Sequence, residues 1–449
     1  MGGFILFSKI KNSSKYLSVL SALLVLSGCG SSDNTGDNSI DPGADQLVSA
    51  TVIDNVPSEV MLEIVKANID ANATNAFGYR AVKIVYNTKG QNDEDVKASG
   101  LLVIPVASDD YKAYLASVGK AFSVSMVCDN HGTIFKNDEA PTSVEIQNGL
   151  PDSNVATVIS GYAGFAAILP DYIGYGESND VTHPYIMKKA SAQASLDMIK
   201  ASMKFMSEND ITLNYQLFIS GYSEGGYVSM ALAQKVQEEF ADRVNLMGVA
   251  PMAGPYNVED LADVELDANH IMVYPAFLAY LSDSYSYYYD DINLEDMVNE
   301  TNTTMFHSLF DGSKSSVEIH MALGLTTNYG FASYPANALF KDSFINDYQN
   351  NVNSPIRVRF QENATDNWTP HTKLNIIQCT DDEIIPFSQS QNLYEKLVEK
   401  EADVTLTPIP TALIPEASAD NPFVHGRCAS TAYGAALTWF NAIRLGEIK

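Results

Sequence analysis

The stretch LFISGYSEGGYVSM, residues 217–230, places Ser223 between two glycines directly after an apolar run. A serine hydroxyl acts as a nucleophile when a base takes its proton and an oxyanion site stabilises the intermediate. The Gly-x-Ser-x-Gly spacing alone is weak evidence, because roughly one random chain of this composition in seven would contain it. Its place between a predicted strand and a predicted helix is stronger evidence, because a strained strand-to-helix turn exposes a nucleophilic serine. We therefore predict that Ser223 is a nucleophile.

The base that would activate Ser223 is identified by its order along the chain. Proteins that use such a turn carry the acid after the serine and the histidine after the acid. The late apolar stretch LNIIQC precedes several carboxylates, and His425 is the one histidine of seven that lies beyond them. An imidazole, whose ordinary pKa is near neutrality, can take a proton and return it to a leaving group. We expect His425, in a loop just before the last helix, to be the base, and His131, which precedes the serine, to be structural.

Three carboxylates compete for the role of the acid that orients the base. They follow one another in the stretch CTDDEIIPF, which begins at the end of the late strand. Asp382 lies four residues before Pro386, a spacing that is typical of acid loops. We favour Asp382, with Asp381 as its competitor and Glu383 as a weaker alternative. The carboxylates without this role would be solvated charges.

Backbone N–H groups near the serine are the expected oxyanion donors. The helix predicted from about Gly225 directs free N–H groups and its positive dipole end toward the serine oxygen, which favours the N–H of Glu224. The stretch DNHGTIF, residues 129–135, follows another apolar run and resembles a His-Gly loop that supplies a second donor. We assign that donor to the N–H of Thr133, and Asp129 is the alternative if the alignment shifts.

The elements that must position these residues alternate along the chain. Apolar runs that end in glycine-containing loops are typical of buried parallel strands. Strands that alternate with helices predict an α/β fold, with a mostly parallel central sheet and helices on both faces. The expected strands are 81–88, 98–106, 121–133, 164–178, 214–220, 245–251, 373–380 and 403–410, and the expected helices are 185–208, 225–243, 388–402 and 429–445.

The alternation breaks down between residues 258 and 371, which are rich in Tyr, Asn and Asp. We expect this segment to be a cap inserted into a core formed by residues 51–257 and 372–449. Its aromatic run MVYPAFLAYLSDSYSYYYDD suits a neutral, apolar ester group, although several of these side chains must pack the cap itself. Tyr172 and Tyr175, in a loop at the same sheet edge, either line the entrance to the site or pack inside the fold.

The first 28 residues have the features of a secretion signal: three lysines, an apolar stretch and small residues. Their ending, LSGC, resembles the bacterial lipoprotein signal, which implies lipidation of Cys29. Residues 29–50 are rich in Gly, Ser and Asp and would tether the protein to a membrane. We expect a lipid-anchored protein of the bacterial cell envelope, on the periplasmic or outer surface. The alternative is an ordinary signal peptide with an incidental cysteine.

Charge and cysteine content restrict the possible partners. The chain has 449 residues, 27 Lys and Arg against 55 Asp and Glu, and a formal net charge of −28. Such a surface repels nucleic acids and anionic lipid headgroups, so neither is an expected ligand. Of the cysteines beyond Cys29, we expect Cys379 and Cys428 to become neighbours if the acid and base loops meet. They would form a disulfide or remain two buried thiols, and the cysteine spacing resembles no zinc site.

The motifs together resemble the α/β-hydrolase superfamily, and in particular secretory lipases of the fungal lipase A type and their bacterial relatives. The resemblance rests on NHGT, PDYIGYGES, GYSEGG, CTDDEIIP and VHG, and on a long insertion between the sixth and seventh strands. It implies Ser223 as nucleophile, Asp382 as acid, His425 as base and Glu224 as oxyanion donor. It also implies hydrolysis of small-molecule or lipid carboxylic esters without a cofactor or a metal. The alternatives are a serine peptidase or acyl-peptidase on the same fold, or a non-catalytic binding protein.

Overall fold

The computed structural model describes residues 46–147, 155, 157–267, 270–300, 303–325, 334–418 and 421–448. The expected signal peptide, Cys29 and most of the expected tether therefore lie outside the described residues. Residues 47–50, at the end of the expected tether, already belong to the first strand. Among the described helices, none combines the length and the apolar character needed to cross a membrane.

A nine-stranded sheet with the order β1-β2-β3-β5-β4-β6-β7-β10-β11 forms the centre of the molecule. The first four strands of this order pair antiparallel, and every pairing from β5 to β11 is parallel. The carboxyl ends of the parallel strands therefore meet at one edge, where the loops that carry the site emerge. The strands are Leu47–Val56 (β1), Gly78–Lys89 (β2), Asp95–Val106 (β3), Val124–Asn130 (β4), Ala166–Pro170 (β5), Leu213–Tyr222 (β6), Asn245–Met252 (β7), Leu374–Cys379 (β10) and Val404–Ile409 (β11).

Helices cover both faces of the sheet, because successive side chains of each buried strand point to opposite sides. Val127 of β4 packs into one hydrophobic cluster together with residues of α2 and α15. Its neighbour Met126 packs into a second cluster with residues of α5, α6 and α14. Every residue of β4, β5 and β10 is buried, as their apolar sequences predict. The helices outside the insertion are Ser58–Asn68 (α2), Asp109–Ser117 (α3), Pro141–Gln147 (α4), Lys188–Glu208 (α5), Glu224–Glu239 (α6), Phe387–Glu399 (α14) and Val424–Arg444 (α15).

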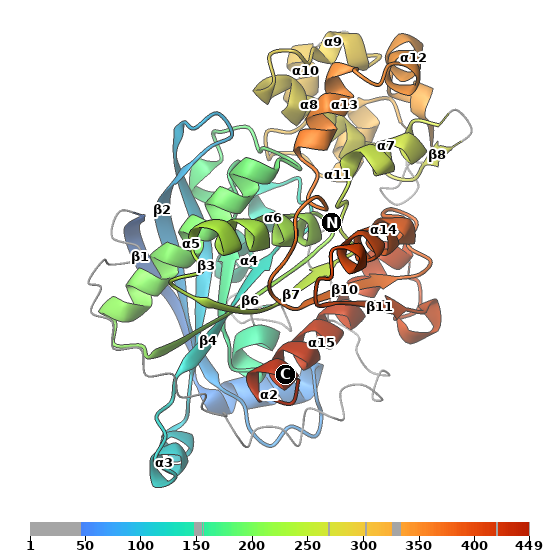
Figure 1. The fold of residues 1–449 in the computed structure, drawn as a ribbon. Helices are drawn as coiled ribbons and strands as arrows, with labels where there is room; N and C mark the ends of the chain where they lie inside the picture. Colours follow the sequence, from blue (N-terminus) through green and yellow to red (C-terminus); the bar gives the residue numbers. More distant parts are fainter. Residues whose placement is uncertain are drawn as a thin grey trace.

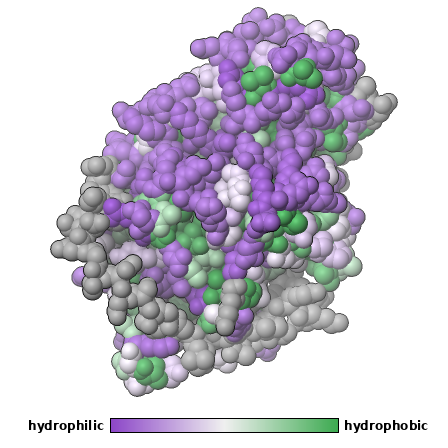
Figure 2. Space-filling model, in the orientation of Figure 1, coloured by the Kyte–Doolittle hydropathy of each residue, from purple (hydrophilic) through white to green (hydrophobic). Residues whose placement is uncertain are grey.

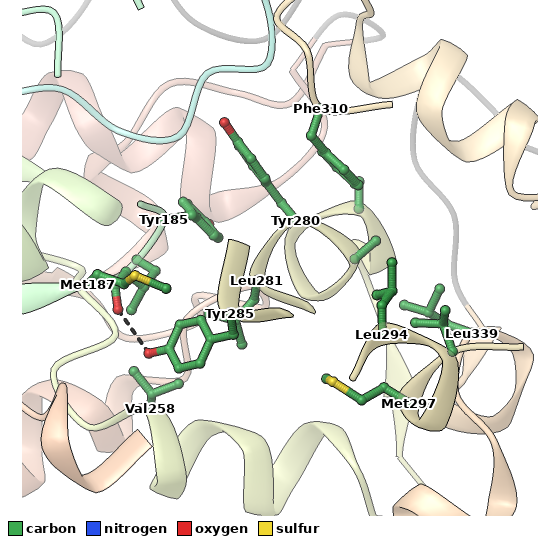
Figure 3. Packing of buried hydrophobic residues seen from close by; sticks show 14 of the residues in the cluster. Tyr185, Met187, Val258, Tyr280, Leu281, Tyr285, Leu294, Met297, Phe310 and Leu339 are labelled. Carbon is green, nitrogen blue, oxygen red and sulfur yellow. Dashed lines mark hydrogen bonds between the residues drawn. The ribbon is translucent and has the colours of Figure 1, made fainter. Parts of the chain in front are cut away.

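The described residues between 258 and 371 form a group that consists mainly of helices, at one end of the molecule (Figure 1). Their aromatic and aliphatic side chains build a third hydrophobic cluster, which includes residues of the core such as Tyr185 and Tyr227. Tyr280 stacks between Phe310 and Tyr185, with ring centroids 4.8 Å and 4.7 Å away (Figure 3). The elements are Val258–Glu265 (α7), Ile271–Met272 (β8), Pro275–Tyr288 (α8), Leu294–Met297 (α9), Thr303–His307 (α10), Ser316–Ala322 (α11), Tyr334–Pro335 (β9), Asp342–Asn350 (α12) and Pro355–Glu362 (α13).

Two features differ from the sequence-based expectation. Strand β1 and helices α2, α3 and α4 were not predicted, and because of β1 the insertion follows the seventh strand of the sheet and precedes the eighth. The last helix begins at Val424, so His425 lies in its first turn and not in a loop before it. Hydrophilic residues cover most of the face drawn in Figure 2, in keeping with the large negative charge.

Candidate active site

Ser223 occupies a strained turn between β6 and α6, with φ 61° and ψ −122°. A positive φ at a residue other than glycine costs roughly 1–3 kcal/mol and persists only where the surrounding structure enforces it. The backbone N–H of Ser223 donates to the carbonyl oxygen of Met252 at 2.9 Å. A Cβ atom at Gly221 would lie 2.3 Å from the carbonyl oxygen of Gly225, and one at Gly225 would lie 1.8 Å from that of Asn130. Both glycines are therefore required by the close approach of α6 to β6 and β4.

The side chains of Ser223, His425 and Asp382 form a continuous hydrogen-bonded chain. His425 Nε2 lies 2.9 Å from Ser223 Oγ, and His425 Nδ1 lies 2.7 Å from Asp382 Oδ2. The other carboxylate oxygen of Asp382 accepts the backbone N–H groups of Ile384 at 3.1 Å and Ile385 at 2.9 Å. A carboxylate held in this way accepts a hydrogen bond from Nδ1–H of the imidazole, which leaves Nε2 free to accept from the serine hydroxyl.

The two neighbouring carboxylates, Asp381 and Glu383, bond to other partners. Asp381 is exposed and accepts from the hydroxyl of Thr411. Glu383 accepts the backbone N–H of Val424 at 2.8 Å, so it fixes the first turn of α15. Of the three candidates for the acid, Asp382 is the one bonded to His425.

Two further contacts that the sequence did not fix hold His425 in place. The hydroxyl of Tyr222 donates to the carbonyl oxygen of His425 at 2.7 Å. Cys379, at the end of β10, forms a disulfide with Cys428 of α15, with their Cα atoms 6.0 Å apart. The bond thus links the strand that leads to Asp382 with the helix that carries His425. Of the two possibilities open for these cysteines, the structure has the disulfide, and Cys128 is a buried free thiol.

The residues expected to supply the oxyanion donors, Glu224 and Thr133, belong to segments next to Ser223. Glu224 is the first residue of α6, and its side chain turns away into a buried pair with His183, 2.9 Å from Oε1 to Nε2. No sequence signal pointed to His183, because the pair joins a loop to the first turn of α6, 41 residues away in the chain. The loop of Thr133 lies against the nucleophile turn, since a Cβ on Gly132 would be 3.4 Å from the Cβ of Ser223.

Asp129, the alternative in the same segment, lies inside β4 as a buried side chain. It accepts hydrogen bonds from the hydroxyls of Ser220 at 2.6 Å and Tyr433 at 3.1 Å. Burial raises the pKa of Asp129 to about 7. Its carboxyl therefore joins β4, β6 and α15 beneath the site.

His131 and the two loop tyrosines form a packed layer beside the turn. The ring of His131 lies 4.0 Å from that of Tyr172, and its nitrogens contact the carbonyl oxygens of Gly132 and Asp171. The hydroxyls of Tyr172 and Tyr175 donate to backbone carbonyls at 3.1 Å and 2.6 Å, and both residues are buried. The structure thus has these tyrosines packing inside the fold and not lining the entrance.

Comparison with known proteins identifies the family. The model of the secretory lipase family matches residues 153–447, more than half of the chain. The chain belongs to the secretory lipase family. The lipase is thereby a hydrolase of carboxylic esters, as its motifs predicted. None of the curated proteins matches it.

Solved structures share the fold of this lipase. The rice cell wall degrading esterase LipA from Xanthomonas oryzae is 21% identical, with a TM-score of 0.73 over 87% of this chain and 97% of the esterase. Lipase A from Candida antarctica in its closed state is 14% identical, with a TM-score of 0.55 over 88% of this chain and 90% of that lipase. These likenesses confirm the predicted α/β-hydrolase fold.

A pocket in the lipase opens beside Ser223, with a volume of about 720 Å³ that includes its mouth. Its walls come from the core, from the loop that follows Asp382, and from α7 and α8 of the insertion. Most of the side chains are apolar, among them Leu261, Phe277 and Leu281. A pocket with walls of this kind suits largely apolar ligands.

Proposed function

We propose that this lipase hydrolyses neutral carboxylic esters through an acyl-enzyme formed on Ser223. The observation that carries the proposal is the chain of hydrogen bonds from Ser223 through His425 to Asp382, at 2.9 Å and 2.7 Å. Each of the three residues comes from a different segment, so their meeting is far more specific than any one motif.

In the proposed reaction, His425 takes the proton of Ser223 as the serine oxygen attacks the ester carbonyl carbon. The N–H groups of Glu224 and Thr133 then stabilise the negatively charged oxygen of the tetrahedral intermediate. His425 passes the proton to the leaving alcohol, and the acyl group remains on the serine. A water molecule, deprotonated by the same imidazole, releases the acid and restores Ser223. Asp382 keeps the imidazole in the required tautomer throughout.

We further propose that residues 258–371 act as a cap that selects the substrate, because α7 and α8 supply much of the pocket wall. Apolar walls favour an uncharged acyl or alcohol group, which gains by leaving water. The acidic character of the whole chain disfavours anionic esters in the same way. Neutral esters are therefore the proposed substrate class.

A substrate panel tests the proposed reaction. We expect turnover of p-nitrophenyl esters from acetate to palmitate, with the preferred acyl length set by the cap, and little turnover of aminoacyl p-nitroanilides. Release of p-nitrophenol is followed by absorbance, with a Ser223→Ala protein as the blank. Turnover of the anilides without turnover of any ester would identify a peptidase. Turnover of neither, with no covalent labelling by a fluorophosphonate, would favour a non-catalytic binding protein.

We also propose that Cys29 is lipidated and anchors the lipase to the cell envelope, since secretory lipases are exported and LSGC ends the leader. Replacing Cys29 with serine is expected to move the protein from the membrane fraction to the soluble fraction, because the polar tether has no affinity for a bilayer of its own. The measurement is fractionation after expression in a bacterium, together with incorporation of labelled palmitate. Ser32→Ala, in the tether, is the matched control. A Cys29→Ser protein that stays with the membranes would contradict the anchor.

A further inference from the structure

One face of helix α7 forms a wall of the pocket beside Ser223. The residues of α7 on this wall are three or four positions apart, as one helix face requires: Val258, Leu261, Ala262 and Glu265. The helix begins six residues after β7 ends at Met252, whose carbonyl oxygen accepts the N–H of Ser223. The Val258 end of the wall is therefore nearer to the nucleophile. Seven residues at about 1.5 Å each place Glu265 about 10 Å farther along the helix.

Glu265 is an unusual side chain for this position, because it puts a carboxyl at the far end of an apolar wall. Its side chain is 12% exposed. Within the part of the chain that the structure describes, no hydrogen bond reaches this carboxyl, and its one ion-pair contact is His270, with Nε2 3.4 Å from Oε1. Burial raises the pKa of Glu265 to about 7, since an apolar environment disfavours the charged form.

Each of the other two carboxyls on the pocket wall has at least one hydrogen bond. Glu224 is bonded to His183, and Glu383 accepts the N–H of Val424. Glu383 also has one buried oxygen, Oε2, without a partner among the described residues, but it lies on the loop after β10, against the first turn of α15. Glu265 differs because neither of its oxygens has a hydrogen bond among the described residues and because α7 places it at the end of the pocket away from the nucleophile. A buried carboxyl in this state gains most from a ligand that brings a hydrogen-bond donor.

We infer that the pocket takes an ester chain with a hydroxyl near its far end, and that Glu265 binds this hydroxyl. The inference rests on the proposed ester hydrolysis and names its substrate class. A hydroxyl can bond to a carboxyl in either protonation state, whereas an ammonium needs an ionised carboxyl, which the apolar walls disfavour. A plain alkyl chain would cover Glu265 and leave its carboxyl buried with no partner beyond the 3.4 Å contact with His270. About 10 Å of extended chain corresponds to roughly eight carbons.

The test compares ω-hydroxy esters with plain esters of the same length. In the acyl arm the substrates are p-nitrophenyl octanoate, ω-hydroxyoctanoate and ω-aminooctanoate. In the alcohol arm they are octyl acetate and its ω-hydroxy counterpart, because either side of the ester can occupy the pocket. We expect kcat/KM to favour the hydroxy ester by about 10-fold in one arm, as a hydrogen bond to a buried carboxyl predicts.

Variants of Glu265 connect this preference to the residue. Glu265→Leu is expected to reverse the ratio in favour of the plain ester by about 10-fold, since the hydroxyl then lacks a partner. Glu265→Gln, which keeps an acceptor oxygen, should retain part of the preference. Asp263→Asn removes a carboxylate from the same helix, where it pairs with Arg357, and should leave the ratio unchanged.

Binding to the Ser223→Ala protein separates failure of this inference from failure of the proposed reaction. Calorimetry with methyl octanoate and methyl ω-hydroxyoctanoate, and with the two acetates of the alcohol arm, measures the preference without turnover. Three results would overturn the inference even with ester hydrolysis intact. They are a ratio of hydroxy to plain ester near one in both arms, a preference for the amino ester, and an equal effect of Glu265→Leu on both substrates. If turnover is absent but the binding preference is intact, the proposed reaction is contradicted and the proposed binding of the hydroxyl by Glu265 is supported.

Discussion

Replacing Ser223 with alanine is expected to lower kcat/KM for p-nitrophenyl butyrate by at least about 10⁴-fold, because the attacking oxygen is removed. The fold should persist, since the hydroxyl bonds to His425 and the strain of the positive φ is much the same for alanine. The measurements are initial rates and thermal unfolding. Ser117→Ala, at the end of α3, is the control and should retain full activity.

Covalent labelling gives a second measurement of the same prediction. A fluorophosphonate should modify Ser223, as located by mass spectrometry of the digested protein, because the attack on phosphorus uses the same hydroxyl and base. The Ser223→Ala protein should remain unlabelled. Modification at another serine, or residual activity near that of the parent protein, would show that the nucleophile lies elsewhere.

Replacing Asp382 with asparagine is expected to lower kcat by about 10⁴-fold. The amide can donate to Nδ1 of His425 and so favours the tautomer in which Nε2 carries the proton and cannot accept from Ser223. The matched control is Asp381→Asn, which removes a carboxylate one residue away, where it is exposed and bonded to Thr411. The kcat of that variant should stay within about 2-fold of that of the parent protein, because exposed charges usually contribute little. The reverse pattern would move the acid to Asp381.

The turn that holds Ser223 was predictable because local chemistry defines it. A buried apolar strand, two glycines and a helix lie next to one another in the sequence, and the structure has β6, the strained serine and α6 in that order. The strand that ends at Cys379 was predictable for the same reason, because LNIIQC is a local apolar stretch, and in the structure all its residues are buried. By contrast, β1 has a mixed pattern of exposed and buried residues at the sheet edge, so its sequence gives no clear signal.

The contacts between distant segments could not be predicted from local patterns. Helix α15 begins with Phe423 at its N-cap and without a capping side chain, which explains why His425 was expected in a loop. The pair of His183 with Glu224 depends on how a loop packs against the first turn of α6, and no periodicity in the sequence indicates it. The short helices α9 and α10 of the insertion, with four and five residues, are likewise too short to show a helical period.

The disulfide between Cys379 and Cys428 has a consequence for how the enzyme matures. Thiol–disulfide exchange keeps such cysteines reduced in a cytosol, whereas oxidising compartments let the bond form. A chain synthesised in a reducing cytosol would reach its folded state with two buried thiols in place of the bond, and β10 and α15 would be held together without a covalent link. Two preparations with the same amino-acid sequence would then differ in their resistance to unfolding, because one was produced in a reducing compartment and the other in an oxidising one.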